Sequence, residues 1–126
     1  MAASDDDATA APPTFPLIVH DDERETLRTA LRTFRDDLGR EEHRIAAVLD
    51  GLLGRLPDDE ATPLSVDAAE MKVTHSALHA ALDDSRREQA DVRAHVRALL
   101  ERLPDEPDIR AIDLEAELDR RERGGR

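Results

Sequence analysis

Two clusters of charged residues share the pattern Asp-Asp-x-x-Arg-Glu, and one cluster lies in each half of the sequence. The residues that define them are Asp37, Arg40, Glu41, Asp84, Arg87 and Glu88. Glu41 and Glu88 occupy positions where the surrounding helical pattern favours Leu or Ile, and antiparallel helices would bring the two clusters face to face. The carboxylates could then bind a metal ion, with Glu41 and Glu88 as facing oxygen ligands. Alternatively, the clusters form a central Arg–carboxylate layer that fixes the register of the helices. We predict this polar layer because neither cluster has the Glu-x-x-His pattern of di-iron bundles.

The spacing of histidines gives a second candidate site. His75 and His79 are four residues apart on one helix face, and His43 would lie at a similar height on an antiparallel neighbour. Three imidazoles could bind zinc or nickel. However, arginine occupies the corresponding positions of the first half, which favours a solvated helix edge. We therefore predict no resident metal or cofactor, and keep His43, His75, His79, Glu41 and Glu88 as the candidate ligands.

The sequence lacks the residues of the commonest catalytic sites. It has no Cys, Trp or Tyr, two Phe and five Gly, and it contains no Gly-rich phosphate loop, nucleophile elbow or His-Glu-x-x-His motif. Substrate pockets are usually lined by apolar and aromatic side chains, and this chain has few aromatic ones. We expect that the protein is not an enzyme.

The two polar clusters belong to an internal duplication. Shifting the sequence by 47 residues aligns residues 16–58 with residues 63–105 without a gap, and 17 of the 43 aligned positions are identical. A composition this skewed would give roughly four identities by chance. The identical positions include Glu23 with Glu70 and Arg55 with Arg102. Two copies are too few for a solenoid, so we expect them to pair about a pseudo-twofold axis.

Each copy begins with a short extended entry that leads into a helix. In the second copy, Asp67 and Glu70 form a predicted capping box at the start of the helix. The first copy has His20 at the cap position and keeps Glu23 three residues later. We therefore expect its helix to start at Asp21.

The apolar residues of each copy predict one long helix. From Leu27 to Leu56 they recur near whole turns of a 3.6-residue helix and stay in one phase. Pro57 and Pro104 then end the helices, since proline cannot continue them. Each helix would run about 35 residues, or about 52 Å. The middle of each copy is the open point, because Asp36–Gly39 and its counterpart Asp83–Arg86 contain helix-breaking residues.

The predicted fold is all-α. The tandem duplication forms a long antiparallel helical hairpin, and two such hairpins dimerise into a four-helix bundle. Leu53, Leu82 and Leu100 lie beyond a narrow seam and motivate the homodimer. If each copy breaks in the middle, the alternative is four shorter helices in a monomeric bundle.

Three segments divide the chain. Residues 1–14 form an acidic tail that is predicted to be disordered because it is polar and aperiodic. Residues 15–104 form the duplicated helical domain. Residues 105–126 contain a short helix, expected over residues 108–122, and a basic tail.

The composition indicates which classes of partner to exclude and how salty the surrounding cytoplasm is. The chain has 30 acidic and 18 basic residues, 17 of them Arg, and a net charge of -12. Such a charge repels phosphate backbones, and no apolar run reaches the roughly 18 residues of a membrane span, so we predict no nucleic-acid or membrane partner. Acid-rich, Lys-poor composition resembles that of proteins from extremely halophilic archaea, whose cytoplasm screens exposed charges.

These observations lead to one functional hypothesis and one alternative. We expect a protein–protein interaction or regulatory module in a halophilic cytoplasm, with an unidentified protein partner. The alternative is a metal-binding or catalytic carboxylate bundle centred on Glu41 and Glu88.

Overall fold

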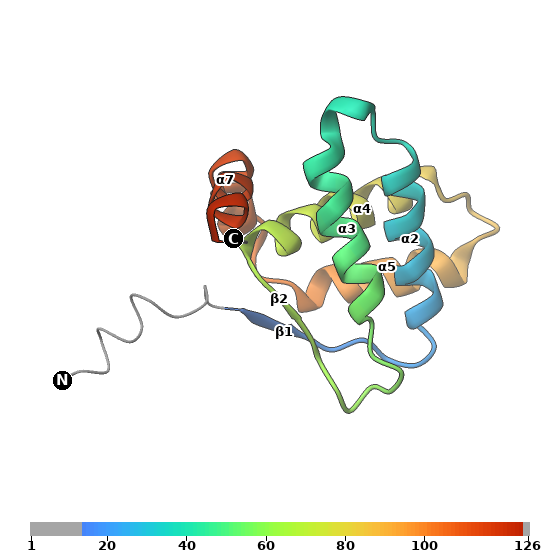
Figure 1. Ribbon diagram of the computed structural model, residues 1–126. Helices are drawn as coiled ribbons and strands as arrows, with labels where there is room; N and C mark the ends of the chain where they lie inside the picture. The colour runs from blue at the N-terminus through green and yellow to red at the C-terminus, as the bar shows by residue number, and fades with distance from the viewer. Residues whose placement is uncertain (1–13, 125–126) are drawn as a thin grey trace.

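The computed structural model describes residues 14–124, which fold into a two-stranded sheet, six α-helices and one short 3₁₀ helix (Figure 1). The elements in chain order are β1 (Phe15–Leu17), α2 (Arg24–Asp36), the 3₁₀ helix η1 (Arg40–Glu42), α3 (His43–Arg55), β2 (Leu64–Val66), α4 (Ala68–Asp84), α5 (Ala90–Arg102), α6 (Glu106–Arg110) and α7 (Leu114–Gly124). No helix of this range is long and apolar enough to span a bilayer. Apart from Thr14, the tail predicted to be disordered lies outside the described residues.

The long helical hairpin predicted from the sequence is wrong, because each copy folds into two helices joined by a loop. In the first copy, α2 ends at Asp36 and α3 begins at His43, and Gly39 between them has extended backbone (φ -82°, ψ 174°). In the second copy, α4 ends at Asp84, and Ser85 is extended (φ -77°, ψ 146°). Acidic side chains are unfavourable at a helix C-terminus, and glycine disfavours helix. The duplicated region therefore has the four shorter helices of the alternative.

The two copies meet at an antiparallel ribbon formed by β1 and β2. Leu17 pairs with Leu64, its own equivalent 47 residues later, and Phe15 pairs with Val66. Because Leu17 pairs with its own equivalent, a pseudo-twofold axis passes between Leu17 and Leu64. Leu17, Leu64 and Val66 are buried, so one face of the ribbon covers the core.

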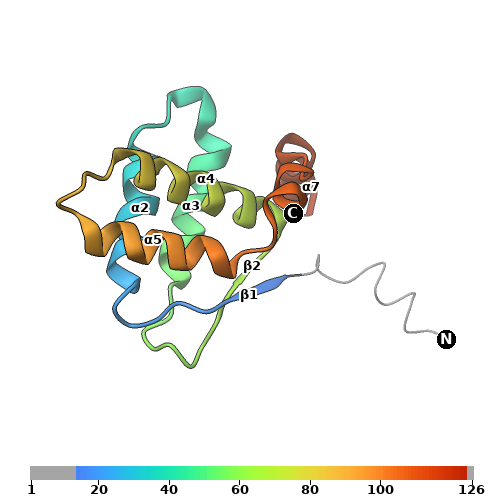
Figure 2. The same cartoon turned by 180° about the vertical axis from the view of Figure 1, so that it is seen from behind.

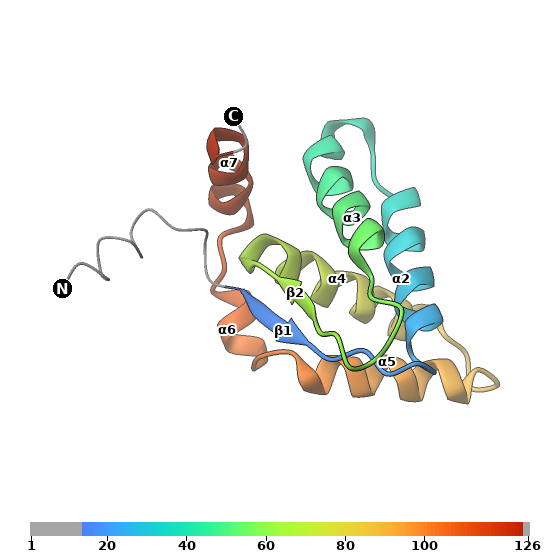
Figure 3. The same cartoon turned by 60° about the horizontal axis from the view of Figure 1, so that its bottom comes forward.

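The helices of the two copies form two crossed hairpins, α2–α3 and α4–α5, that stack on each other (Figures 1 and 2). The central helix is α4, which packs against α2, α3, α5, α6 and α7. The ribbon and α7 gather at the N-terminal end of α4 (Figure 3). The shared core contains apolar side chains from both copies, among them Leu17, Leu27, Leu31, Val48, Leu49, Leu52, Leu64, Leu78, Val96 and Leu99.

The apolar residues that motivated a homodimer pack inside the chain. Leu53, Leu82 and Leu100 are partly buried against the core. Within residues 14–124, Ile18 is the one large apolar side chain that is exposed, with 38% of its surface accessible. The reason for expecting a dimer is therefore removed, and the dimer itself stays a prediction.

The start of the second copy's helix agrees with the prediction. The Asp67 carboxylate accepts a hydrogen bond from the backbone N–H of Glu70 at 2.9 Å, and the Glu70 carboxylate accepts one from the N–H of Asp67 at 2.9 Å. In the first copy, Glu23 accepts from the N–H of His20 at 3.0 Å, but α2 begins only at Arg24. The start predicted at Asp21 is wrong, because residues 21–23 form a turn and α2 begins after Glu23, which makes no side-chain cap.

The C-terminal segment forms two helices where the sequence predicted one. The helix α6 ends at Arg110, and Asp113 then caps the start of α7 by accepting from the N–H of Ala116 at 3.1 Å. Buried Ile109 and Leu118 anchor α6 and α7 to the core. Ion pairs hold the polar side of α7. Arg44 of α3 pairs with Glu115 at 2.6 Å and with Asp119 at 2.7 Å. Asp67, which caps α4, pairs with Arg121 at 2.7 Å.

Candidate functional site

Two ion pairs join the copies reciprocally. Glu23 at the start of α2 binds Arg102 at the end of α5, and both oxygens of its carboxylate accept from the guanidinium. Glu70 in the first turn of α4 binds Arg55 at the end of α3, at 2.8 and 3.1 Å. Glu23 is the equivalent of Glu70, and Arg55 is the equivalent of Arg102, so each copy gives its acid to the other copy's arginine.

The same two arginines also bind the loop and strand that enter the helices. Arg102 donates to the backbone carbonyl of Ile18 at 3.1 Å, and Arg55 donates to that of Ser65 at 2.7 Å. Ile18 and Ser65 are themselves equivalent positions. The acids lie at helix N-termini and the arginines at helix C-termini, where the helix dipoles favour those charges. This arrangement fixes the two copies around their axis.

Burial makes these pairs sensitive to the loss of one partner. Both Glu23 and Glu70 are 4% exposed. The bidentate hydrogen bond from Arg102 lowers the pKa of Glu23 below its ordinary value, although burial acts in the opposite direction. The carboxylate in turn raises the pKa of Arg102. Glu23 therefore stays ionised at neutral pH.

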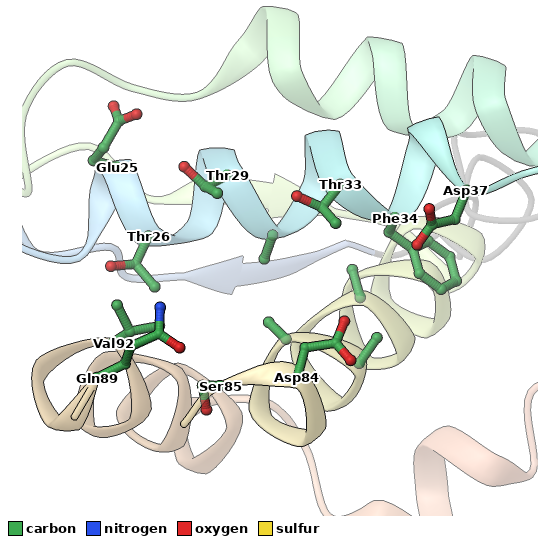
Figure 4. A pocket seen from close by; sticks show the side chains of 14 residues that line it. Glu25, Thr26, Thr29, Thr33, Phe34, Asp37, Asp84, Ser85, Gln89 and Val92 are labelled. Carbon is green, nitrogen blue, oxygen red and sulfur yellow. The ribbon is translucent and has the colours of Figure 1, made fainter. Parts of the chain in front are cut away.

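A groove of about 370 Å³ lies between α2, α4 and the start of α5 (Figure 4). The wall from α2 consists of Glu25, Thr26, Thr29, Ala30, Thr33, Phe34 and Asp37. The other residues come from α4, the loop after it and α5, and they are Ala77, Ala80, Ala81, Asp84, Ser85, Gln89 and Val92. The equivalent residues Ala30 and Ala77 are both buried at its base. The groove therefore follows the contact between the two copies.

The groove combines small apolar side chains with acidic ones. Glu25, Asp37 and Asp84 are exposed, and no Lys or Arg of the described chain lines the groove. Figure 4 shows Asp37 where α2 finishes and Asp84 where α4 finishes, on opposite walls of the groove. Thr26 in the α2 wall shares a 2.9 Å hydrogen bond with Nδ1 of His95, which joins α2 to α5.

The structure does not form the predicted central polar layer. Asp37 and Asp84 come together in the groove, but Arg40, Glu41, Arg87 and Glu88 lie exposed in the two segments that connect the helices. None of these four side chains makes an ion pair within residues 14–124. The layer required continuous helices, and their break moves the clusters from the middle of a hairpin to its turns. Glu41 and Glu88 are thus not placed as facing metal ligands.

The histidine candidates separate into a pair and a single residue. The rings of His75 and His79 lie with their centroids 4.4 Å apart at 62°, and they line a second cavity beside α6. Burial and the neighbouring His79 lower the pKa of His75. His43 is the first residue of α3, is exposed, and does not line this cavity.

Among residues 14–124, one group of three side chains already has the spacing of metal ligands. Ligand atoms of His20, Asp22 and Glu23 all lie within 4.8 Å of one another. Both oxygens of Glu23 are already hydrogen-bonded to Arg102, whose positive charge also opposes a cation. This cluster is therefore a poor metal site.

Two features of the duplication were not predicted from the sequence: the reciprocal ion pairs and the groove between the copies. The identity of Glu23 with Glu70 and of Arg55 with Arg102 was the available signal, because opposite charges kept in both copies can pair reciprocally about a twofold axis. The groove had a weaker signal in the small residues of α4, Ala77, Ala80 and Ala81. Neither could be placed while each copy was taken as one straight helix.

Comparison of the chain with models of protein families, with curated proteins and with solved structures gives no match.

Proposed function

We propose that the protein is a protein-binding module whose groove between α2, α4 and α5 accepts the apolar face of a basic amphipathic helix from a partner protein. The observation that carries this proposal is the lining of the groove, which has an apolar base and three acidic side chains but no basic side chain in the described chain. Helices commonly dock into grooves through residues spaced along one face. A partner with Arg or Lys beside its apolar residues would complement both parts of the lining.

The dimensions of the groove define what can enter it. From Glu25 to Asp37, α2 rises about 18 Å at 1.5 Å per residue, which matches three turns of a partner helix. A volume of about 370 Å³ admits a row of side chains from that helix, and the helix backbone would lie across the opening. Small residues such as Ala80 and Ala81 allow this close approach.

Charge separates the proposed partner from a second copy of the chain. A groove-to-groove dimer would bring Glu25, Asp37 and Asp84 against the same acids of the other molecule. A basic helix instead forms attractive pairs with them. At about 1 M salt the Debye length is about 3 Å, comparable to a contact ion pair, so only direct contacts contribute in a salty cytoplasm. The acidic composition supports such a halophilic setting for the module.

The test uses calorimetric titration with a designed 18-residue helical peptide in about 0.5 M KCl, after circular dichroism has confirmed folding. The peptide carries a Leu/Ala stripe flanked by Arg, and its control carries Glu at the flanking positions. We expect the Arg peptide to bind one per chain and the Glu peptide at least about tenfold more weakly. Equal binding of the two peptides, or no binding of either, would contradict the proposal.

Two matched pairs of variants locate the binding. Ala80→Trp fills the groove and should abolish binding, whereas Ala94→Trp places the same side chain on an exposed position of α5 outside the groove. Asp37→Asn with Asp84→Asn should weaken binding on the order of fivefold. The adjacent pair Asp36→Asn with Asp83→Asn removes the same charge outside the groove and should leave binding unchanged.

Light scattering in about 2 M KCl tests a second copy as the occupant. A mass of 14.0 kDa would show that no second copy occupies the groove. A mass of twice that value would indicate a dimer. If Ala80→Trp then returns the mass to 14.0 kDa and Ala94→Trp does not, the groove is the site of self-association.

A further inference from the structure

A second cavity of about 370 Å³ lies where α4 faces α6. Its lining includes His75, His79 and Glu106, together with Lys72 and Arg110. It shares no lining residue with the groove. Whatever binds here is therefore independent of the proposed docking function.

We propose that His75, His79 and Glu106 bind one divalent transition-metal ion of the Zn²⁺ or Ni²⁺ class. Residues four apart in an α-helix share a face, and this spacing presents two imidazoles to one ion in known zinc motifs. The rings of His75 and His79 already lie side by side, with centroids 4.4 Å apart. Imidazole nitrogens bind zinc at about 2.0–2.1 Å, so both rings and the Glu106 carboxylate would turn toward one ion on binding.

Both imidazoles keep nitrogens available for a metal. Within residues 14–124, His95 is the one histidine whose ring takes part in a hydrogen bond or an ion pair. His75 and His79 are partly buried, so the cavity partly shields them from water.

Glu106 provides the third ligand from a different helix. Its carboxylate is paired with Arg110, but the side chains of Glu106 and Arg110 are 45% and 75% exposed. Exposed pairs of this kind stabilise a protein by little, so Glu106 can turn from Arg110 to the metal. Water completes the coordination, as in sites with three protein ligands.

Lys72 and Arg110 also line the cavity, and their positive charges act against a cation there. Lys72 donates to the backbone carbonyls of Ile109 and Arg110 at 3.3 and 3.2 Å, which holds its ammonium group against α6. The net charge of -12 raises the local concentration of divalent cations around the whole molecule. Two imidazoles and one carboxylate select Zn²⁺, Ni²⁺ or Cu²⁺ over Mg²⁺ and Ca²⁺, which prefer oxygen ligands.

The test is calorimetric titration of Ni²⁺ and Zn²⁺ into the full chain without a His tag, with Mg²⁺ as the comparison ion. We expect one Ni²⁺ or Zn²⁺ per chain, displaced by protons as the histidines become charged, and no corresponding Mg²⁺ site. His75→Ala and His79→Ala should each weaken Ni²⁺ binding by at least about tenfold, and Glu106→Gln by a smaller factor. His43→Ala removes an exposed histidine elsewhere and is the matched control.

A melting curve separates the site from adventitious binding and from misfolding. Ni²⁺ should raise the melting temperature of the wild type and of His43→Ala, because a ligand that binds the folded state stabilises it. It should not raise that of His79→Gln, and far-ultraviolet circular dichroism checks that this variant is folded. The proposal is overturned if His75→Ala and His79→Gln bind Ni²⁺ as the wild type does, or if His43→Ala loses the site.

Discussion

At the residue scale, four side chains hold the duplicated halves together. Glu23 and Glu70 are buried acids, and each binds an arginine from the other copy at the end of a helix. Their environments differ in one respect, because Arg121 of α7 also approaches Glu70, at 3.8 Å. Glu23 depends on Arg102 alone among the described guanidinium groups, so it is the better position for a test.

Replacing Glu23 with Gln should lower the free energy of unfolding by about 3 kcal/mol at neutral pH, because it leaves the Arg102 guanidinium without its counter-charge. The pKa of Glu23 is lowered from 4.5 in the folded state, so its contribution is complete above that value and is lost as pH falls through the folded pKa. Urea unfolding at several pH values should show a steeper loss for the wild type than for Glu23→Gln below about pH 4.5.

The exposed pair of Arg35 and Asp50 provides the control for this prediction. Asp50→Asn should change the unfolding free energy little, because both side chains are in water. Equal effects of Asp50→Asn and Glu23→Gln would mean that the buried pair contributes no more to the free energy of unfolding than the exposed pair.

Thr74 offers a second test at the residue scale. It is fully buried on α4, and its hydroxyl has no hydrogen-bond partner among the described residues. Its equivalent in the first copy is the core residue Leu27. Thr74→Val should raise the free energy of unfolding by about 1 kcal/mol, because Val keeps the shape and removes an unpaired polar group.

Thr29→Val is the matched control, since Thr29 is exposed on α2 and Thr and Val have similar helix propensities. Urea unfolding measures both variants. A loss of stability in Thr74→Val would show that the hydroxyl is hydrogen-bonded after all.

At the element scale, the caps and ends of helices could be predicted from the sequence, but the way the chain turns between helices could not. The cap at Asp67 and the ends of α3 and α5 before Pro57 and Pro104 follow from single residues and agree with the structure. The break near Gly39 was expected only as the alternative, because the apolar stripe stays in phase across it. Phase shows which side of each helix faces a core, and two helices that fold back onto the same core can keep the phase of one continuous helix.

The candidate site was partly visible for the same reason. Asp37 and Asp84 belonged to the two predicted polar clusters, and both line one groove in the structure. Arg40 and Arg87 were predicted on the same helix face as these acids. The helices end before both arginines, which lie in the connecting segments. The reciprocal pairs required knowledge of the hairpin directions, which depends on tertiary packing.

Asp67→Ala should destabilise the protein by about 1 kcal/mol, because it removes the side-chain cap of α4. Loss of its 2.7 Å ion pair with Arg121 would also loosen α7. His20→Ala changes the equivalent position of the first copy, whose side chain does not cap α2, and should have a much smaller effect. Thermal unfolding compares the two, and equal destabilisation would refute the asymmetry between the copies.

At the scale of the whole molecule, the surface is strongly acidic. Within residues 14–124, Glu23 and Glu70 are the buried acids, so the other carboxylates of that range reach water. Their mutual repulsion is long-ranged in dilute salt, where the Debye length is about 30 Å at 0.01 M, and short-ranged at about 1 M. The fold should therefore depend on salt.

The melting temperature should rise as KCl increases from about 0.05 to about 2 M, because salt screens this repulsion. A triple variant, Asp58→Asn, Asp59→Asn and Glu60→Gln, removes a run of exposed charge in the loop before β2 and keeps oxygen acceptors at each position. It should melt higher than the wild type in dilute salt and gain less from KCl. A wild-type melting temperature that is flat across this range would contradict the halophilic interpretation.

We propose that the groove between the two copies is the binding surface of the molecule. The most direct measurement is a two-dimensional ¹⁵N–¹H NMR titration with the Arg-flanked peptide, which reports every backbone amide at once. We expect shifts concentrated along the groove, at residues such as Thr29, Ala77 and Ala80, with Leu17 on the ribbon and Leu118 on α7 unchanged. Shifts centred on the ribbon or on α7, or no shifts at saturating peptide, would contradict it.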